Sequence, residues 1–409
     1  MNKPLQISNR LESIPEALSI YINQLVYDLR RMGKDITVLS LGEAFFDIPL
    51  LNFKKLDIGK GFHYSDSQGL PELRNKISNY YKNNYNSLVE PDDILISAGS
   101  KILLFMVMQA ILNQGDEVLI IEPAWLSYQE QCRLVGAEPV FIKYDEEIEN
   151  FGKYITDKTK VLIINNPNNP AGRLYTKSEL LLIYNICRKQ GIYVVVDEAY
   201  SDFVGSNQFI SMASVVPDKD GIIIVNSLSK NMGMSGWRVG YAISSAEIIR
   251  SLLKLNQHLI TCAPTILQEY MAYYFDKVIS ITLPQVDQVV KKREKISTML
   301  DKLGLKRLAG TCTFYFFINV EKFPGTSLEL SLILLLKHSI SVVPGSAYGK
   351  STKDFIRVSI GAEPEERIWD ALCVIRDTIN SNVSEIKAID DQIKNLGFLK
   401  YEDLHNIIK

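Results

Sequence analysis

The sequence has no closely spaced cysteines and no clustered histidines. Its five cysteines are scattered and form no Cys-x-x-Cys pair, and its four histidines stand far apart from one another. A disulfide framework or a zinc site needs closer spacing, so we expect reduced thiols, a cytoplasmic location and no metal. The sequence therefore gives no support for metal chemistry.

Long apolar runs and a large net charge are missing as well. No apolar run approaches the roughly 20 residues of a membrane-spanning helix. The N-terminal segment lacks the apolar core of a secretory signal, so we expect the mature chain to start at or near Met1. The formal net charge of -2 argues against general binding to nucleic acid or to an anionic membrane. We expect neither as a partner.

What is present is an ordinary globular composition in a chain long enough for two domains. The 409 residues are 46% hydrophobic and 22% charged, without internal repeats or low-complexity linkers. The middle of the chain alternates strand-like and helix-like segments, which predicts an α/β fold with a mostly parallel sheet covered by helices. We expect strands within 92–99, 116–125, 160–172, 192–200 and 221–225, and helices over 100–112 and 177–191.

The C-terminal third has a different pattern. A long amphipathic helix over 287–304 precedes short strands within 313–320, 340–345 and 354–361. This pattern predicts a second, smaller α+β domain, which a helix over 18–33 is expected to join. The predicted division is a large domain over 48–285 and a small domain made of 1–47 and 286–409, with a polar helical appendage after about Ser381 that shows no chemistry.

Several polar and aromatic side chains follow the strand ends, where ligands collect in open α/β sheets. Gly99 and Ser100 precede a helix and could seat an anion, although a plain N-cap is the simpler interpretation. Asp197 ends a run of valines, and such a carboxylate needs either a structural cation or a protonated ligand nitrogen. Trp125 could belong to the core or cover a flat ring. Asn169, in a Pro-flanked turn, most simply bonds its own backbone.

Lys230 is the most informative residue, in the stretch NSLSKNMGMSGWRVGY over 226–241. An amine becomes a nucleophile when burial or nearby cations lower its pKa, and Arg238 and the strand-end position could supply both. Lys230, Asp197, an anion seat and a flat-ring platform together match pyridoxal 5′-phosphate (PLP). That cofactor has an aldehyde, a pyridine nitrogen, a phosphate and a flat ring.

At this point the sequence resembles the class I/II, fold-type I PLP-dependent aminotransferases, and among them the bacterial aspartate aminotransferases. The resemblance runs from about Val38 to about Ile379. It rests on eight motifs in the family's order: LSLGEAFFDIP, YSDSQGLPELR, ISAGSK, PAWLSY, NNPNNPAG, DEAY, SLSKNMGMSGWRVGY and FIRVS.

The resemblance implies a role for each matching residue. Lys230 would bind PLP as a Schiff base and then move a proton between the substrate and the cofactor. Asp197 would pair with the ring nitrogen, Tyr200 and Asn169 would bond the ring oxygen, and Trp125 would stack on the ring. The cofactor's phosphate would be held by Gly99, Ser100, Ser227, Ser229 and Arg238, with Lys101 nearby.

The substrate side and a second subunit are implied in the same way. Arg357 resembles the arginine that binds the substrate α-carboxylate as a bidentate fork, with Gly42 offering a backbone N–H and with Trp125 and Asn169 close by. Tyr64 resembles the tyrosine that reaches the neighbouring subunit's phosphate, which implies a homodimer with shared active sites. The small-molecule partners would be an amino acid and a 2-oxo acid such as 2-oxoglutarate.

The choice of amino acid stays open in the sequence. Lys101 matches a lysine that binds a distal carboxylate in one bacterial branch, which implies an acidic substrate such as aspartate. The alternative is that it points to solvent from the first turn of a helix. Phe45, at the substrate entrance, and Cys312, expected close to the substrate side, replace residues common in relatives. They leave an aromatic or secondary-pathway substrate as an alternative.

Two other functions share this scaffold. Carbon–sulfur lyases and other eliminating or decarboxylating enzymes use the same lysine and phosphate seat, so the motifs separate them weakly from transaminases. A PLP-sensing regulator would carry a DNA-binding domain before the aminotransferase-like part. Only about 37 residues precede VLSLGE here, too few for a typical independent domain.

Overall fold

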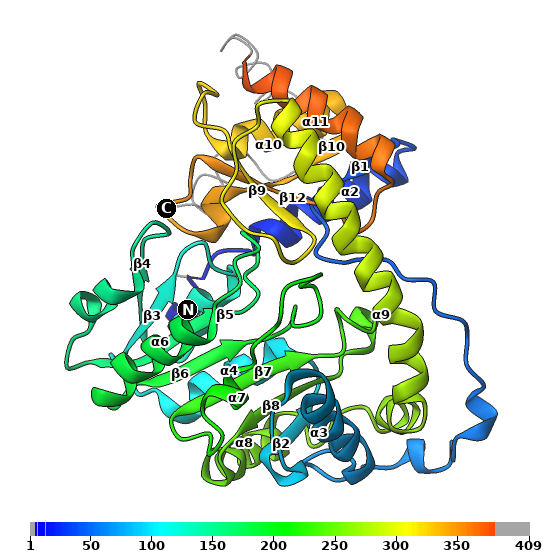
Figure 1. Ribbon diagram of the computed structural model, residues 1–409, viewed down its shortest axis with the longest axis vertical. Coiled ribbons are helices and arrows are strands. Elements are labelled where there is room, and N and C mark those ends of the chain that lie inside the picture. Colours follow the sequence, from blue (N-terminus) through cyan, green and yellow to red (C-terminus); the bar gives the residue numbers. More distant parts are fainter. Residues whose placement is uncertain (1–4, 6, 13, 381–409) are drawn as a thin grey trace.

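The computed structural model describes residues 5, 7–12 and 14–380, and Figure 1 shows two layered units connected by one long helix. A seven-stranded sheet with helices on both faces forms the lower unit in that view. Smaller sheets with helices packed on them form the upper unit. Within the described residues, no helix is long and apolar enough to span a bilayer.

The large sheet is mostly parallel, as predicted. Its strand order is β2-β8-β7-β6-β5-β3-β4. The neighbours from β4 to β7 pair in parallel, whereas β8 runs antiparallel to both β7 and β2. The strands are β2 (Ile94–Ser97), β3 (Glu117–Ile121), β4 (Glu138–Ile142), β5 (Thr159–Asn165), β6 (Tyr193–Asp197), β7 (Ile222–Ser227) and β8 (Gly240–Ser244).

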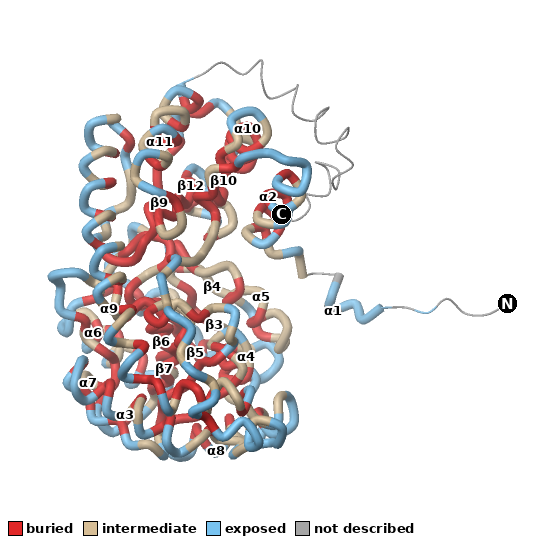
Figure 2. Tube along the Cα trace, turned by 90° about the vertical axis from the view of Figure 1, so that its right-hand side faces the viewer, coloured by how far each residue is buried: buried red, intermediate tan, exposed pale blue. Residues whose placement is uncertain are grey.

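Both faces of this sheet are buried, which explains the continuous apolar runs in its sequence. Side chains alternate along a strand, so in β6 Val194 and Val196 enter one core while Val195 enters the other. Figure 2 shows these strands as buried in the centre of the lower unit. Helices α3 (Pro71–Tyr85), α6 (Lys177–Lys189), α7 (Met212–Val215) and the first part of α9 pack on the first face; α4 (Ser100–Ile111), α5 (Ser127–Leu134) and α8 (Ala246–Leu259) pack on the second.

The upper unit gathers both ends of the described chain around one core. Its buried side chains come from 18–44 and 286–379, joined by Ala199, Tyr200 and Phe203 from the lower unit. The division at 48 and 285 stays a prediction. The elements are α2 (Leu18–Arg31), β1 (Thr37–Val38), β9 (Tyr315–Asn319), α10 (Ser327–His338), β10 (Ile340–Ser341), β11 (Val343–Pro344), β12 (Phe355–Ser359) and α11 (Glu365–Ile379), with a short α1 (Asn9–Glu12) before them.

The long helix α9 (Thr265–Lys302) differs from the prediction, which had it begin at 287. It continues through Pro284, although a proline inside a helix costs about 3 kcal/mol. Phe275 and Val278 bury themselves against the lower unit before this proline, and Val286 and Val290 enter the upper core after it. Packing at both ends outweighs the local cost. The predicted appendage after Ser381 lies outside the described residues.

Candidate active site

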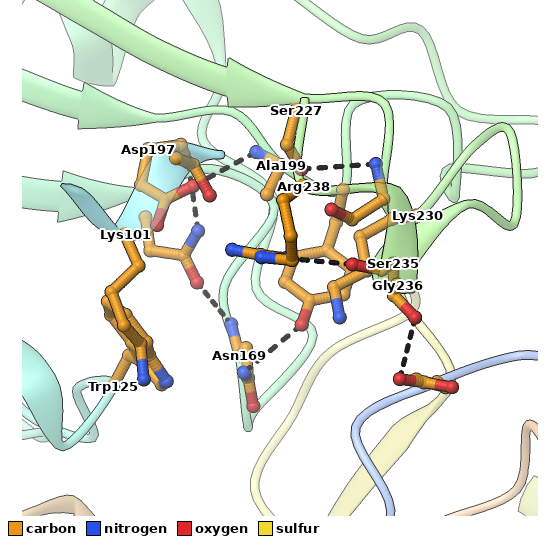
Figure 3. A pocket seen from close by; sticks show the side chains of 15 residues that line it. Lys101, Trp125, Asn169, Asp197, Ala199, Ser227, Lys230, Ser235, Gly236 and Arg238 are labelled. Atoms are coloured by element: carbon orange, nitrogen blue, oxygen red, sulfur yellow. Dashed lines mark hydrogen bonds between the residues drawn. The ribbon is translucent and has the colours of Figure 1, made fainter. Parts of the chain in front are cut away.

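One cavity of about 300 Å³ lies at the carboxyl ends of the parallel strands, a volume at the lower end of those typical for ligand pockets. Figure 3 shows its side chains converging from several strand ends. Ten residues predicted from the sequence line it: Ser100, Lys101, Trp125, Asn169, Asp197, Tyr200, Ser227, Ser229, Lys230 and Arg238.

The loop between β7 and β8 brings Lys230 and Arg238 to this cavity together. Because the two strands are antiparallel, the loop starts and ends at the same edge of the sheet. Arg238 adopts a left-handed backbone conformation (φ 56°), which costs of order 1–3 kcal/mol for a residue other than glycine and is often found at functional sites. Its Nη1 donates to the Ser235 carbonyl over 2.8 Å, which holds the guanidinium in place.

The start of α4 forms an anion seat beside this arginine. Gly99 has a φ of 92°, and a Cβ at this position would collide with the Arg238 guanidinium. No side chain caps the helix, so its first N–H groups and the positive end of its dipole stay available to an anion. This arrangement favours the anion-binding interpretation of Gly99 and Ser100 over the plain N-cap.

Asp197 presents a buried carboxylate without an ion pair. Its Oδ2 accepts from the Tyr128 hydroxyl over 2.7 Å, and its Oδ1 accepts from the Ala199 N–H over 3.0 Å. Burial raises the pKa of this carboxyl, while these hydrogen bonds and the Lys230 charge oppose the rise. Because no described lysine or arginine lies within ion-pair distance of Asp197, the carboxylate can pair with a ligand cation.

The Asn/Pro loop after β5 is fixed by side-chain hydrogen bonds. Asn165 accepts from the Asn169 N–H over 2.6 Å and donates to the Asp197 carbonyl over 2.8 Å. These bonds use only the backbone of Asn169. Its side-chain amide donates to the Tyr200 hydroxyl over 3.2 Å. Figure 3 shows this row of contacts along one side of the cavity. The side chain of Asn169 faces the cavity rather than closing a turn on its own backbone.

Lys230 contacts the upper unit directly. Its Nζ donates to the Gly42 carbonyl over 2.5 Å. Burial lowers the pKa of this amine to about 8; Glu43 and Asp197 oppose the shift, and Arg357 and Arg238 add to it. An amine with this pKa has a substantial neutral fraction near neutral pH, as a nucleophile requires.

Arg357, on β12, is buried just beyond the cavity lining. Its Nη2 donates to the Ser40 carbonyl over 2.6 Å, and its Nη1 donates to Asn169 Oδ1 over 3.3 Å. Its Cζ lies 4.5 Å from the ring centre of Tyr315 and 5.3 Å from that of Tyr348. The Nε has no partner in the described part of the chain. A buried, unpaired donor is costly, so this guanidinium is held ready for an anion.

Lys101 turns toward the cavity rather than away from it. Its Nζ lies 5.0 Å from the centre of the Trp125 ring, within the range of a cation–π contact. Burial, and then the Arg238 charge, lower the pKa of its ammonium group. Figure 3 shows the two side chains lying together at one end of the cavity.

Residues named in the sequence analysis that are absent from the cavity lining are Gly42, Gly99 and Arg357, each described above, and Tyr64, Phe45 and Cys312. Tyr64 is 84% exposed and lines a separate surface hollow. Phe45 is 63% exposed and does not line the cavity. Cys312 is fully buried and does not line the cavity, and its carbonyl accepts from Arg293 Nε over 2.8 Å. Its closeness to the substrate side stays a prediction.

The structure also adds residues that the sequence analysis missed. Tyr128 bonds Asp197, and its only signal was its place in PAWLSY, close after Trp125. Glu43 lines the cavity and accepts from the Ser235 hydroxyl over 2.7 Å, which ties the LGE turn to the lysine loop. Asn165 gave no signal apart from the loop motif that contains it.

Comparison with known proteins agrees with this geometry. Residues 26–374 match the family described as aminotransferase class I and II. The chain belongs to this family. It is 33% identical to a (5-formylfuran-3-yl)methyl phosphate transaminase of Methanocaldococcus jannaschii, over 91% of this chain and 100% of that protein. It is 30% identical to an aspartate aminotransferase of Thermotoga maritima, over 92% and 100% of the two chains.

Solved structures place this aminotransferase in the fold-type I group. An aspartate aminotransferase from Thermus thermophilus, solved with maleate, superposes with a TM-score of 0.84 at 26% identity. The match covers 91% of this chain and 100% of that one.

Aminotransferases of this family are PLP-dependent, and the cavity fits that cofactor. No cation among residues 14–380 pairs with the carboxylate of Asp197, which suits a protonated ring nitrogen. Gly99 leaves room beside Arg238 that a Cβ would fill, at an uncapped helix start that suits a phosphate. Lys230 is an amine with a lowered pKa, which suits an aldehyde.

Proposed function

We propose that this aminotransferase binds PLP through Lys230 and moves the amino group of an acidic amino acid, such as aspartate, to a 2-oxo acid such as 2-oxoglutarate. The observation that carries the substrate class is the ammonium of Lys101, which lies over Trp125 inside the cavity lining. Together with Arg357 it offers two cations, one for each carboxylate of a dicarboxylic substrate. The aspartate aminotransferases among its relatives agree with this choice.

PLP, when bound, supplies an aldehyde for amine exchange and an electron sink for the substrate Cα carbon. The chain's own groups provide the position and the proton transfer. The anion seat at Gly99 and Arg238 anchors one end of the cofactor and so orients the reacting carbon. Asp197 would keep a ring nitrogen protonated, and the hydroxyl of Tyr200 with the amide of Asn169, which contact each other, would hold the ring oxygen.

Lys230 takes the proton-transfer step in this proposal. Lys230 would hold the cofactor's aldehyde, and its amine, once released by an incoming amino group, would lie beside the substrate Cα–H as a general base. The pKa of about 8 lets it accept a proton and return it near neutral pH. Arg357 fixes the α-carboxylate, so that the Cα–H bond is presented to Lys230.

We also propose a homodimer in which Tyr64 serves the partner's site. Tyr64 and Phe62 are 84% and 82% exposed, which is unusual for aromatic side chains without a partner. If sites are shared, mixing Tyr64→Ala with Lys230→Ala gives hybrids with one intact site, and activity returns to about a quarter of the wild-type value. Monomers in light scattering would contradict the homodimer, and no recovery on mixing would contradict the role of Tyr64 in the partner's site.

A product balance tests the central reaction. Purified holoenzyme is incubated with aspartate, alanine, aromatic or branched-chain donors, each with 2-oxoglutarate. The proposal expects the oxo acid and glutamate in equal amounts, fastest with the acidic donor. A parallel incubation with a cysteine thioether and no oxo acid tests the lyase alternative, which pyruvate, ammonia and a thiol in equal amounts would establish. A preference for aromatic donors in the first assay would overturn the substrate class.

A further inference from the structure

Tyr315 lies directly behind the cavity and contacts three parts of the proposed site. It is fully buried at the start of β9 and does not line the cavity. Its hydroxyl lies 2.9 Å from the hydroxyl of Tyr200, and its ring centre lies 4.5 Å from Arg357 Cζ. A Cβ added to Gly42 would lie 3.4 Å from the same hydroxyl.

Either hydroxyl could donate in the contact between the two phenols. Burial raises the pKa of both Tyr200 and Tyr315, so each keeps its proton in the working pH range. Tyr200 also accepts from Asn169 Nδ2. Of the described groups, only Tyr200 bonds the Tyr315 hydroxyl, so one phenol must donate to the other.

We propose that Tyr315 is a positioning residue that donates its proton to Tyr200, which directs the Tyr200 proton into the cavity. The inference rests on the proposed function, in which Tyr200 donates to the ring oxygen of PLP. With Asn169 and Tyr315 both donating to its oxygen, Tyr200 has a single direction left for its own proton. An O–H whose oxygen accepts hydrogen bonds is polarised, which makes it the stronger donor.

Tyr348 provides a matched control. It is also buried, and its ring centre lies 5.3 Å from Arg357 Cζ. Its hydroxyl has no hydrogen-bond partner among the described residues. Tyr315→Phe and Tyr348→Phe therefore each remove one buried hydroxyl beside Arg357, but only the first removes a hydrogen bond to Tyr200.

The test is a pH titration of the visible absorbance of the PLP holoenzyme in four proteins: wild type, Tyr200→Phe, Tyr315→Phe and Tyr348→Phe. Weaker donation from Tyr200 leaves more negative charge on the ring oxygen, close to the Lys230 nitrogen. The pKa of that nitrogen therefore rises. We expect Tyr200→Phe to raise the titration midpoint most and Tyr315→Phe to raise it by about 0.4–1 pH unit. Tyr348→Phe should leave it unchanged.

The outcomes separate the inference from the proposed function. A shift in Tyr200→Phe with none in Tyr315→Phe would overturn the inference and leave the proposed function standing. An unchanged midpoint in both variants would show that Tyr200 does not donate to the ring oxygen, which would overturn both that part of the proposed function and the inference. In the Tyr200→Phe background, Tyr315→Phe should add no further shift, whereas an equal shift there would show a general packing effect. Equal thermal unfolding midpoints for Tyr315→Phe and Tyr348→Phe check that both fold.

Discussion

The two walls of the cavity are built in different ways. On the sheet wall, Ser100, Asp197 and Ser227 each stand at the end of a strand or the start of a helix. On the facing wall, Glu43 lines the cavity, and Gly42 and Arg357 lie just behind the lining. Gly42 and Arg357 come from segments more than 300 residues apart, brought together by packing of the upper unit. Parallel strands fix the first wall locally, whereas the second depends on tertiary contacts.

Polar contacts join these walls, among them the contact between the Tyr200 and Tyr315 hydroxyls described above. Lys230 donates to the Gly42 carbonyl, Ser235 donates to Glu43, and Arg357 donates to Asn169. Each pairs a group of the sheet wall with a group of the facing wall. Secondary structure therefore positions the residues on the cofactor side. Packing between the lower and upper units positions those on the substrate side.

Removing the amine of Lys230 from the sheet wall should lower turnover more than substitution of Arg357 or Lys101. We expect Lys230→Ala to abolish the visible absorbance of the holoenzyme and to lower turnover by roughly 10⁴-fold, because nucleophile and general base are lost together. Spectra and initial rates measure both. Lys177→Ala, at an exposed lysine outside the cavity, is the control. An active Lys230→Ala enzyme would end the assignment.

A substitution in the facing wall should weaken the binding of the substrate more than the binding of the cofactor. Arg357→Lys keeps the charge but loses the bidentate fork, and a charge-assisted hydrogen bond contributes about 1.5–3 kcal/mol. We therefore expect kcat/KM for the amino donor to fall about 10–100-fold while the holoenzyme spectrum is retained. Steady-state kinetics and absorbance check this. An unchanged KM for the amino donor together with loss of the bound cofactor would show that Arg357 serves the cofactor and not the substrate.

A substitution of Lys101, on the sheet wall, tests the preference for an acidic amino donor. Lys101→Met keeps the length of the side chain and removes its charge. We expect kcat/KM for aspartate to fall about 10-fold, the equivalent of one charged contact, and the value for alanine to change less than about 2-fold. Parallel kinetics with the two donors measure the ratio. Equal losses for both would mean that Lys101 serves the cofactor and not the distal carboxylate.

Glu198, next to Asp197, should affect stability and not chemistry. It bonds Ser211, the Met212 N–H and Tyr81, and burial raises its pKa from 4.5 to about 8. The folded state therefore binds a proton that the unfolded state releases. This contribution to stability is full below about pH 4.5 and is lost as pH rises toward about 8, at up to about 1.4 kcal/mol per pH unit.

Glu198→Gln should flatten this pH dependence. Urea unfolding of the wild type and the variant at pH 5.5 and pH 8 measures the change. The same slope in both proteins would show that Glu198 is ionised throughout this range.

The sequence predicted the sheet wall well, because a residue at a strand end is positioned by the strand itself. Lys230 and Asp197 follow from this rule, and so does the anion seat at Gly99. Tyr128 and Tyr315 do not, since each acts through a contact that depends on how a helix or the upper unit packs. The early start of α9 was missed for the same reason, because burial on both sides of Pro284 overrides the local signal.

The most direct test of the central claim is to locate the lysine that binds the cofactor. Borohydride reduction of the PLP holoenzyme fixes the cofactor to its lysine, and peptide mass mapping then identifies that residue. The proposed function predicts the added mass on the peptide that contains Lys230. Added mass on Lys101, the other lysine that lines the cavity, with Lys230 unmodified, would contradict it.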